Sequence, residues 1–380
     1  MDKKVLELKK DIENMADQNR KELEDISSYI HENPELSFEE YKAQEILCDY
    51  LEKNEFKIEK GIGGLETSFE GIYDTGIAGK KIAFLAEYDA LPDVGHGCGH
   101  NLIGTSAVGA GVILKEIIKE NNIPGMIKVI GTPAEENGSG KITMVDKGVF
   151  KGLDAALIMH PSDASMPDDI SFAAATIEYN FKGVSAHAAA FPWKGSSALN
   201  GVIQLFNNIN ALRLHTKDYS RIHGIITDGG SAHNTIPEKA TALFNIRALD
   251  FEYLMELIKQ INNCAKGVAL STNTTVEISQ KGEIIKDIRN DKDLVGIVRN
   301  NMSFIKEEFI ERDLTQGIGS TDVGNVTHEI PAIQFYIKLK DNIGTHTIEF
   351  EKYSGNEYGK RTLNSAVKVL AMSGLDVLLK

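Results

Sequence analysis

The chain has 380 residues, of which 42% are hydrophobic and 25% charged, as is usual for a soluble globular protein. Two domains are expected at this length, because a single hydrophobic core rarely serves more than about 250–300 residues. The net charge of −14 argues against a nucleic-acid or anionic-membrane partner, since such partners require basic patches.

The cysteine content and the N-terminal segment bear on location. Three cysteines are too few and too scattered for a disulfide framework. The charged, amphipathic N-terminal segment lacks the apolar stretch of a signal peptide, and no run approaches the about 18 apolar residues of a membrane span. We therefore expect a cytoplasmic protein without a membrane partner.

The first part of the chain predicts alternating helices and strands, from helical spacing of apolar residues and from short apolar, β-rich runs. The expected elements are helices over 3–31, 37–54 and 105–120, and strands over 81–86, 126–132 and 155–159. This alternation predicts an α/β domain with a largely parallel sheet.

The pattern changes after residue 175. The expected elements are strands over 175–182, 221–227, 241–247 and 275–279, and helices over 196–214 and 251–269. Their order, β-α-β-β-α-β, is that of a ferredoxin-like domain. The first pattern then returns, with a helix over 291–309, a strand over 332–338 and a helix over 356–379. We predict an α+β domain over 176–286, inserted as a mobile lid into an α/β domain formed by 1–175 and 287–380.

Metal-binding and proton-transferring side chains gather near the ends of the predicted strands, where α/β proteins build their active sites. The candidates are Asp89, Cys98, His100, Glu135, Glu136, His160 and, near the C-terminus, His346. Thiolate, imidazole and carboxylate groups bind borderline-soft divalent metals. One of two adjacent glutamates can bind metal while the other accepts a proton from bound water. The pattern predicts a metal-dependent hydrolase.

Over essentially its whole length the chain resembles the aminoacylase, hippurate hydrolase and p-aminobenzoyl-glutamate hydrolase group of dinuclear metallopeptidases. A metal motif from Asp89-Ala-Leu-Pro92 to Gly95-His-Gly-Cys-Gly-His-Asn101 is followed by six further motifs in matching order. These are Pro133-Ala-Glu-Glu136, Gly183-Val-Ser-Ala-His-Ala-Ala189, Gly229-Gly-Ser-Ala-His-Asn-Thr-Ile-Pro237, Asn245-Ile-Arg247, Gly319-Ser-Thr-Asp322 and Gly344-Thr-His346. The resemblance implies a zinc-exopeptidase-like catalytic domain with an inserted lid and dimerisation domain.

The resemblance also implies a role for each matching residue. Two divalent ions per subunit, zinc or manganese with cobalt or nickel as alternatives, would be bound by Cys98, His100, Glu136, His160 and His346. Glu135 matches the general base and Asp89 the carboxylate that orients a ligand. His187 matches a lid histidine that reaches the active site of a neighbouring subunit.

The expected substrate is a dipeptide, an N-acyl amino acid or an aminobenzoyl-glutamate, each of which has an amide next to a carboxylate. Asn234 and Arg247 match lid residues that bind this carboxylate. The run Gly319, Ser320 and Thr321 offers backbone and hydroxyl donors that would complete the anion pocket. A homodimer is expected, because a half-exposed sheet and the apolar face of helix 196–214 need a partner.

Two alternative functions stay open at this point. In the first, Cys98 is the nucleophile of a thiol hydrolase and His100 its base, although no third residue that would orient them is evident. In the second, the chain is a catalytically inactive binding protein of the same fold. Glu135 and every ligand candidate are present, which disfavours the second alternative.

Overall fold

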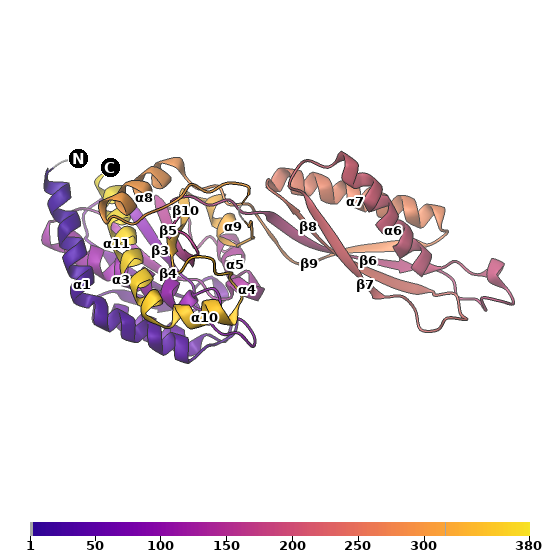
Figure 1. The fold of residues 1–380 in the computed structure, drawn as a ribbon, viewed down its shortest axis with the longest axis horizontal. Coiled ribbons are helices and arrows are strands. Elements are labelled where there is room, and N and C mark those ends of the chain that lie inside the picture. Colours follow the sequence, from indigo (N-terminus) through magenta and orange to yellow (C-terminus); the bar gives the residue numbers. More distant parts are fainter. Residues whose placement is uncertain (1–2, 316) are drawn as a thin grey trace. The chain divides into compact units, whose positions relative to one another are not determined.

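The computed structural model describes residues 3–315 and 317–380, and the chain divides into two compact units (Figure 1). Unit 1 comprises Met1–Ile170, Ile288–Gly317 and Thr321–Lys380. Unit 2 comprises Ser171–Asp287 together with Ile318–Ser320. The short return segment Ile318–Ser320 was not part of the predicted insert.

A six-stranded sheet forms the centre of unit 1, with the strand order β1-β2-β4-β3-β5-β10. The strands are β1 Lys57–Lys60, β2 Phe69–Asp74, β3 Lys81–Ala86, β4 Met126–Gly131, β5 Ala155–Ser162 and β10 Ala332–Lys338. The pairs β4–β3, β3–β5 and β5–β10 are parallel, as predicted, whereas β1–β2 and β2–β4 are antiparallel. The sequence analysis missed β1 and β2. The Lys-Ile-Glu-Lys run of β1 is mostly exposed and has too few apolar residues to give a strand pattern.

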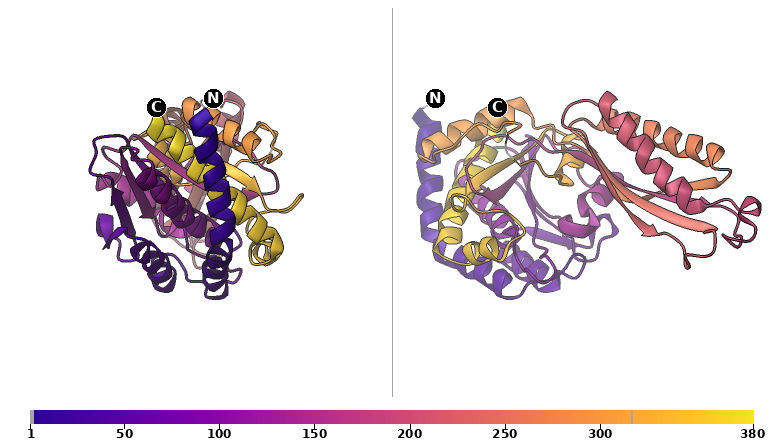
Figure 2. Two further views of the ribbon diagram at one scale, coloured as in Figure 1. Left: turned by 90° about the vertical axis from the view of Figure 1, so that its left-hand side faces the viewer. Right: turned by 45° about the vertical axis from the view of Figure 1, so that its right-hand side comes forward.

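Helices cover this sheet. They are α1 Lys3–Glu32, α2 Tyr41–Lys53, α3 His100–Glu120, α4 Glu135–Gly138, α5 Gly140–Asp146, α8 Lys292–Phe304, α9 Val323–Thr327, α10 Ile348–Ser354 and α11 Glu357–Leu379, with a 3₁₀ turn η1 at Ile62–Gly64. Helices α1, α3 and α11 pack against one another, so that elements from both ends of the chain lie side by side (Figure 2). The N- and C-terminal parts of the chain therefore share one core.

Three predicted helix boundaries were wrong by more than two residues. Helix α2 begins at Tyr41 rather than at residue 37, and α8 ends at Phe304 rather than at 309. Helix α3 begins at His100, five residues earlier than predicted, directly after Gly99 in the left-handed conformation with φ +71°. A glycine adopts this conformation without strain, and it lets the chain turn abruptly into the helix. His100 is therefore in the first helical turn.

Helices α3 and α11 are long and apolar enough to cross a membrane by length and composition, which the sequence analysis did not anticipate. However, 94% and 72% of their most apolar windows are buried inside the protein. Close packing explains the small residues of α3, because a Cβ atom on Gly111 would lie 2.5 Å from Val129 Cγ2. Both helices have the environment of core helices.

Unit 2 is a two-layer α+β structure. Its strands are β6 Ala173–Lys182, β7 Arg221–Asp228, β8 Lys239–Ala248 and β9 Thr275–Ile285, and its helices are α6 Ala198–Leu212 and α7 Phe251–Ser271, with 3₁₀ turns η2 Pro192–Lys194 and η3 Arg213–His215. The strands are antiparallel in the order β7-β8-β6-β9, and both helices pack on one face of the sheet (Figure 1). The predicted ferredoxin-like order is confirmed.

The apolar face of α6 has its partner inside unit 2. Val202, Leu205 and Ile209 are buried in the same core as residues of α7 and the sheet. The expectation that this face requires a second subunit was therefore wrong. Apolar side chains are exposed at Ile203 of α6 and on the edge strand β7, where Ile225 and Ile226 are 62% and 43% exposed.

Candidate metal centre

The carboxyl ends of parallel strands bring the predicted site residues of unit 1 together. Glu87 and Asp89 follow β3, and the adjacent Glu135 and Glu136 form the start of α4 after β4. Because β3 is parallel to both β4 and β5, these ends lie at one edge of the sheet. His160 lies within β5, which continues for two residues beyond it instead of ending there as predicted.

Two groups of ligand-type side chains form at this edge. Cys98, Glu136 and His346 make one group, and His100, Glu135 and Glu136 make the other. Within each group the ligand atoms lie within 4.8 Å of one another, and Glu136 belongs to both. Two adjacent cation sites that share a carboxylate would have this arrangement.

His160 is in neither group. Its Nε2 atom lies 2.9 Å from Oε2 of Glu87, a residue that the sequence analysis did not select. Glu87 is fully buried, and its Oε2 also lies 3.5 Å from His100 Nε2. The signal was present in the sequence, since a charged residue directly follows the apolar strand 81–86.

Asp89 holds two members of the site in place. His100 Nδ1 lies 2.9 Å from Asp89 Oδ1, a contact that puts the ring hydrogen on Nδ1 and leaves Nε2 as the ligand atom. The backbone N–H of Glu136 donates to Asp89 Oδ2 at 3.0 Å, and the Ser37 hydroxyl donates to the same oxygen at 3.0 Å. Asp89 thus contacts both the ring of His100 and the backbone at the start of α4.

Strained backbone flanks the two adjacent glutamates. Ala134 before α4 and Ser139 after it have φ values of +59° and +51°. Such non-glycine residues cost of order 1–3 kcal/mol each and persist where the surroundings hold them, often at functional sites. The buried Glu40 carboxylate supplies part of this hold, because it accepts the Ala134 N–H at 2.9 Å.

His346 is also in the left-handed conformation, with φ +63°. Its backbone N–H donates to the Gly97 carbonyl at 3.0 Å, which ties the C-terminal loop to the segment that carries Cys98. His346 Nε2 lies 3.6 Å from Glu136 Oε2, and its side chain is 59% exposed. The short C-terminal motif therefore reaches the site, at its outer side.

A buried lysine lies beside the carboxylates. Lys141 Nζ lies 2.6 Å from Glu87 Oε1 and 2.7 Å from Asp322 Oδ1, and all three side chains are fully buried. Lys141 is in the first turn of α5, where it is an internal counter-charge to the two carboxylates.

Further positive charge would stabilise the buried carboxylates of this site. Burial and then the carboxylates of Glu87, Asp322 and Glu136 raise the pKa of Glu135 well above its ordinary value. Burial opposes protonation of His100, but the Asp89, Glu87 and Glu136 carboxylates outweigh it and raise the pKa of the ring well above its usual range. Divalent cations would supply this charge.

Unpartnered buried atoms agree with a metal-binding role. Among the described residues, His100 Nε2, His160 Nε2 and Glu136 Oε1 make no hydrogen bond although they are buried. Buried polar atoms without partners are rare in folded proteins unless an ion or water satisfies them. Imidazole, carboxylate and thiol groups form the donor set that zinc and similar ions prefer. The residues therefore fit divalent metal ions.

The same geometry disfavours a thiol nucleophile. Burial and the adjacent Glu136 carboxylate raise the pKa of the Cys98 thiol, so that without a metal it is protonated and unreactive. His100 directs Nδ1 to Asp89 and Nε2 toward Glu87 and Glu136. The predicted base, His100, therefore faces carboxylates at both ring nitrogens and is not available to activate Cys98.

The other predicted residues lie in unit 2, apart from Thr321. The backbone brings His187 and Asn234 together, because the Ala188 N–H donates to the Asn234 carbonyl at 3.0 Å and His187 forms a β-bridge with Thr235. Both side chains are exposed. Thr321 belongs to unit 1, where it is buried and its Oγ1 accepts the Val323 N–H.

Arg247 and Ser320 are close to each other in unit 2. Arg247 Nε donates to Asn245 Oδ1 at 2.8 Å, and its Nη1 lies 3.4 Å from Ser320 Oγ. The Gly319 carbonyl accepts the Phe172 N–H at 2.8 Å, which fixes the return segment against the start of β6. The guanidinium is thus held in one orientation at the end of β8.

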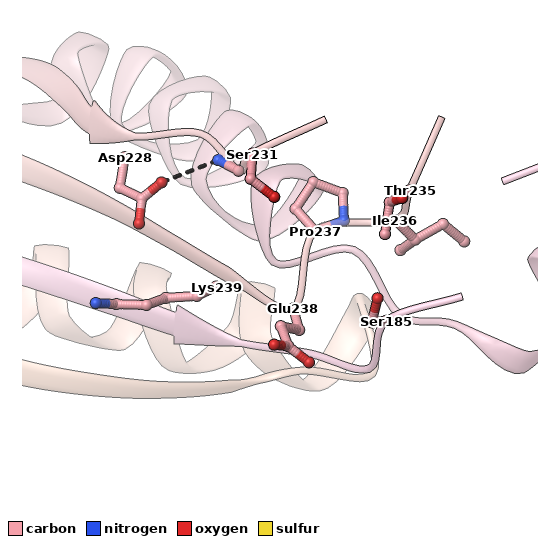
Figure 3. Close-up of a pocket in the computed structure, with 9 residues that line it drawn as sticks. Ser185, Asp228, Ser231, Thr235, Ile236, Pro237, Glu238 and Lys239 are labelled. Carbon is pink, nitrogen blue, oxygen red and sulfur yellow. Dashed lines mark hydrogen bonds between the residues drawn. The ribbon is translucent and has the colours of Figure 1, made fainter. Parts of the chain in front are cut away.

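A small cavity of about 260 Å³ lies beside the loop that carries Asn234 (Figure 3). Ser231 and Thr235 lie on one side of it, and Ser185, Glu238 and Lys239 on the other (Figure 3). It belongs entirely to unit 2 and does not include Arg247.

Comparison with known proteins identifies the family. A solved dinuclear metal-binding peptidase of the M20 family from Bacillus subtilis has the same fold, with a TM-score of 0.78 and 19% identity over 96% of this chain and 99% of that chain. The family model for the peptidase dimerisation domain matches residues 171–273. The Xaa-Arg dipeptidase of Mus musculus is 33% identical over 98% of this chain and 89% of its own length. The chain belongs to the M20 peptidase family.

A further relative of this M20 chain is a p-aminobenzoyl-glutamate hydrolase polypeptide of Escherichia coli, 35% identical over 70% of this chain and 59% of the relative. The family assignment confirms the predicted resemblance and the predicted fold class. It also makes this M20 chain a metal-dependent hydrolase of amide bonds. The thiol-hydrolase alternative is thereby set aside.

Proposed function

We propose that this M20 peptidase hydrolyses the amide bond of a small substrate whose amine side carries a free carboxylate: a dipeptide, an N-acyl amino acid or an aminobenzoyl-glutamate. The adjacent pair Glu135 and Glu136 is the observation that carries the proposal. Glu136 belongs to both groups of ligand-type side chains, while Glu135 lies beside it within 4.8 Å of the His100 ligand atom. The names of the dipeptidase and hydrolase relatives support this substrate class.

Two divalent ions complete the proposed site, with zinc or manganese as the first candidates and cobalt or nickel as alternatives. Their ligands would be Cys98, His100, Glu136, His160 and His346. When bound, such ions lower the pKa of a water molecule and polarise the scissile carbonyl. The B. subtilis neighbour is described as dinuclear, which supports two ions.

The protein's own groups then move the proton and orient the site. Glu135 accepts the proton of the attacking water and returns it to the departing amine. Burial and the carboxylates around it raise the pKa of Glu135, and cations at the adjacent ligands would lower that pKa again. Asp89 keeps His100 and the backbone of Glu136 in place throughout.

Unit 2 supplies substrate recognition in this proposal. The planar guanidinium of Arg247 suits a carboxylate, and Asn234, Gly319 and Ser320 add polar groups to the anion pocket. Thr321, which directly follows Ser320 and belongs to unit 1, would add a further hydroxyl. His187 would act on the active site of a second subunit and hold the oxyanion. A homodimer is supported by the match to a peptidase dimerisation domain and by the unpaired edge of β7 with its exposed isoleucines.

We also propose that the enzyme works in the cytoplasm on small molecules, without nucleic-acid or membrane partners. The three cysteines are unpaired in the structure, as is usual in a reducing compartment. The net charge of −14 disfavours anionic polymers and lipid surfaces.

Hydrolysis of matched substrate pairs tests the proposal. Purified enzyme is reconstituted with zinc, manganese or cobalt and given dipeptides, N-acyl amino acids and aminobenzoyl-glutamate beside their carboxamide forms. We expect cleavage of the free acids, loss of activity with a chelator, and retention of activity after treatment with iodoacetamide. Full amidase activity in metal-free protein would overturn the metal mechanism.

A further inference from the structure

Glu87 occupies a tightly fixed position at the end of β3. Its side chain is fully buried, and helix α3 packs directly against its backbone. A Cβ atom on Gly104 of α3 would lie 2.8 Å from the Glu87 carbonyl oxygen, so only glycine permits this approach. The backbone therefore holds the carboxylate at the strand edge where the ligand candidates meet.

The Oε2 atom of Glu87 converges with two imidazole nitrogens. It lies 2.9 Å from His160 Nε2 and 3.5 Å from His100 Nε2, yet none of these three atoms makes a hydrogen bond among the described residues. Two ligand atoms on a tetrahedral ion with bonds of about 2.0–2.1 Å stand about 3.3 Å apart. The distances from Glu87 Oε2 to the two imidazole nitrogens lie on either side of this value, so these three atoms are spaced like ligand atoms around an ion.

The other oxygen of the carboxylate is held by a counter-charge. Lys141 Nζ lies 2.6 Å from Glu87 Oε1, and Lys141 is fixed in turn by Asp322 through its Nζ at 2.7 Å and its backbone N–H at 2.9 Å. Partners of this kind set the orientation of a ligating carboxylate. The lysine thus leaves Oε2, and not Oε1, directed at the two histidines.

We propose that Glu87 is a further metal ligand of this site, binding through Oε2 between His100 and His160, and that Lys141 and Asp322 hold its carboxylate in position. The proposal accounts for His160, which otherwise lies outside both groups of ligand-type side chains. It rests on the proposed function, because it adds a ligand to the metal site described there.

Zinc binding to the metal-free full-length enzyme, followed by isothermal titration calorimetry, tests this ligand. Glu87→Gln keeps the shape of the side chain and removes its charge. Removal of a residue that only orients a metal ligand lowers metal affinity about 10–100-fold, and we expect this variant to weaken zinc binding by at least as much. The visible spectrum of the cobalt-substituted protein should change as well, because the coordination of the ion changes.

Glu70→Gln is the matched control, since Glu70 is a buried glutamate whose carboxylate pairs with Lys128 at 2.6 Å, between β2 and β4. It should bind zinc like the wild type. Unchanged zinc affinity and an unchanged cobalt spectrum in Glu87→Gln would overturn the proposal. Wild-type protein that binds no zinc would instead overturn the proposed function itself.

Glu87→Asp separates a ligand from a charge that merely balances Lys141. The shorter side chain keeps the negative charge beside the lysine but withdraws its oxygens from the two histidines. A ligand role predicts weaker zinc binding, whereas a charge-balancing role predicts wild-type affinity and would count against the proposal. This variant also provides the test should Glu87→Gln fail to fold.

Discussion

The Asp89 carboxylate fixes the ring of His100: Oδ1 lies 2.9 Å from His100 Nδ1, and both side chains are buried. The contact leaves His100 Nε2 directed toward Glu136 and Glu87. A histidine whose second nitrogen is held by a carboxylate is a more basic and better oriented metal ligand.

Asp89→Asn should therefore weaken metal binding. The amide keeps the shape but removes the charge, and we expect an about 10–100-fold loss in zinc affinity, as measured by calorimetry. Ser37→Ala removes only a hydroxyl partner of Asp89 and serves as the control, with a smaller effect expected. Equal effects of the two substitutions would mean that the carboxylate does not act through His100.

Glu135→Gln should abolish most of the activity while the metal stays bound. The substitution removes the proton acceptor and leaves the ligand candidates intact, so we expect kcat to fall about 10²–10⁴-fold. Elemental analysis of the same protein should give the wild-type metal content. Glu136→Gln is the matched comparison and should lose metal; the reverse outcome would exchange the two roles.

Arg247→Ala should remove the preference for a free carboxylate. On carboxamide substrates the Arg247 guanidinium has no carboxylate to bind, so the kcat/KM of the wild type should be about 10²-fold or more below that for the free acids. The variant should not discriminate between the two forms of substrate. Arg213→Ala is the control, because Arg213 is exposed and also donates to an asparagine, Asn210. A preference that survives in Arg247→Ala would move the clamp to other residues.

Mixed dimers should recover activity from two inactive variants. If His187 acts in the partner's site, a mixed dimer of His187→Ala and Glu135→Gln subunits has both defects in one site and leaves the other site intact. Random exchange makes about half of the dimers mixed with one intact site each, so about a quarter of the wild-type activity should return.

Ile226→Lys should weaken this assembly, since a charge on an unpaired edge strand opposes strand pairing. Analytical ultracentrifugation measures the dimer, and the same run checks that subunits exchange in the mixing experiment. Complete exchange without recovered activity would exclude a shared site.

Most of the element order was readable from the sequence, because apolar periodicity is a local property. The strands 81–86 and 332–338 match β3 and β10, and the β-α-β-β-α-β order of unit 2 is as expected. Helix α6 shows the limit of this reasoning. Its apolar stripe was correctly seen, but only packing could decide that α7 and the sheet of the same unit cover it.

The sequence by itself determined the fold class and the family and offered a set of candidate metal ligands near strand ends, because each of these depends on residue type and on short motifs. Tertiary structure decided which charges meet. Lys141 and Asp322 are separated by 181 positions, and nothing local marks Lys141 as the partner of Asp322 or of Glu87. Burial makes an unpaired charge costly, so such side chains find their counter-charges through packing of distant segments, which no local pattern records.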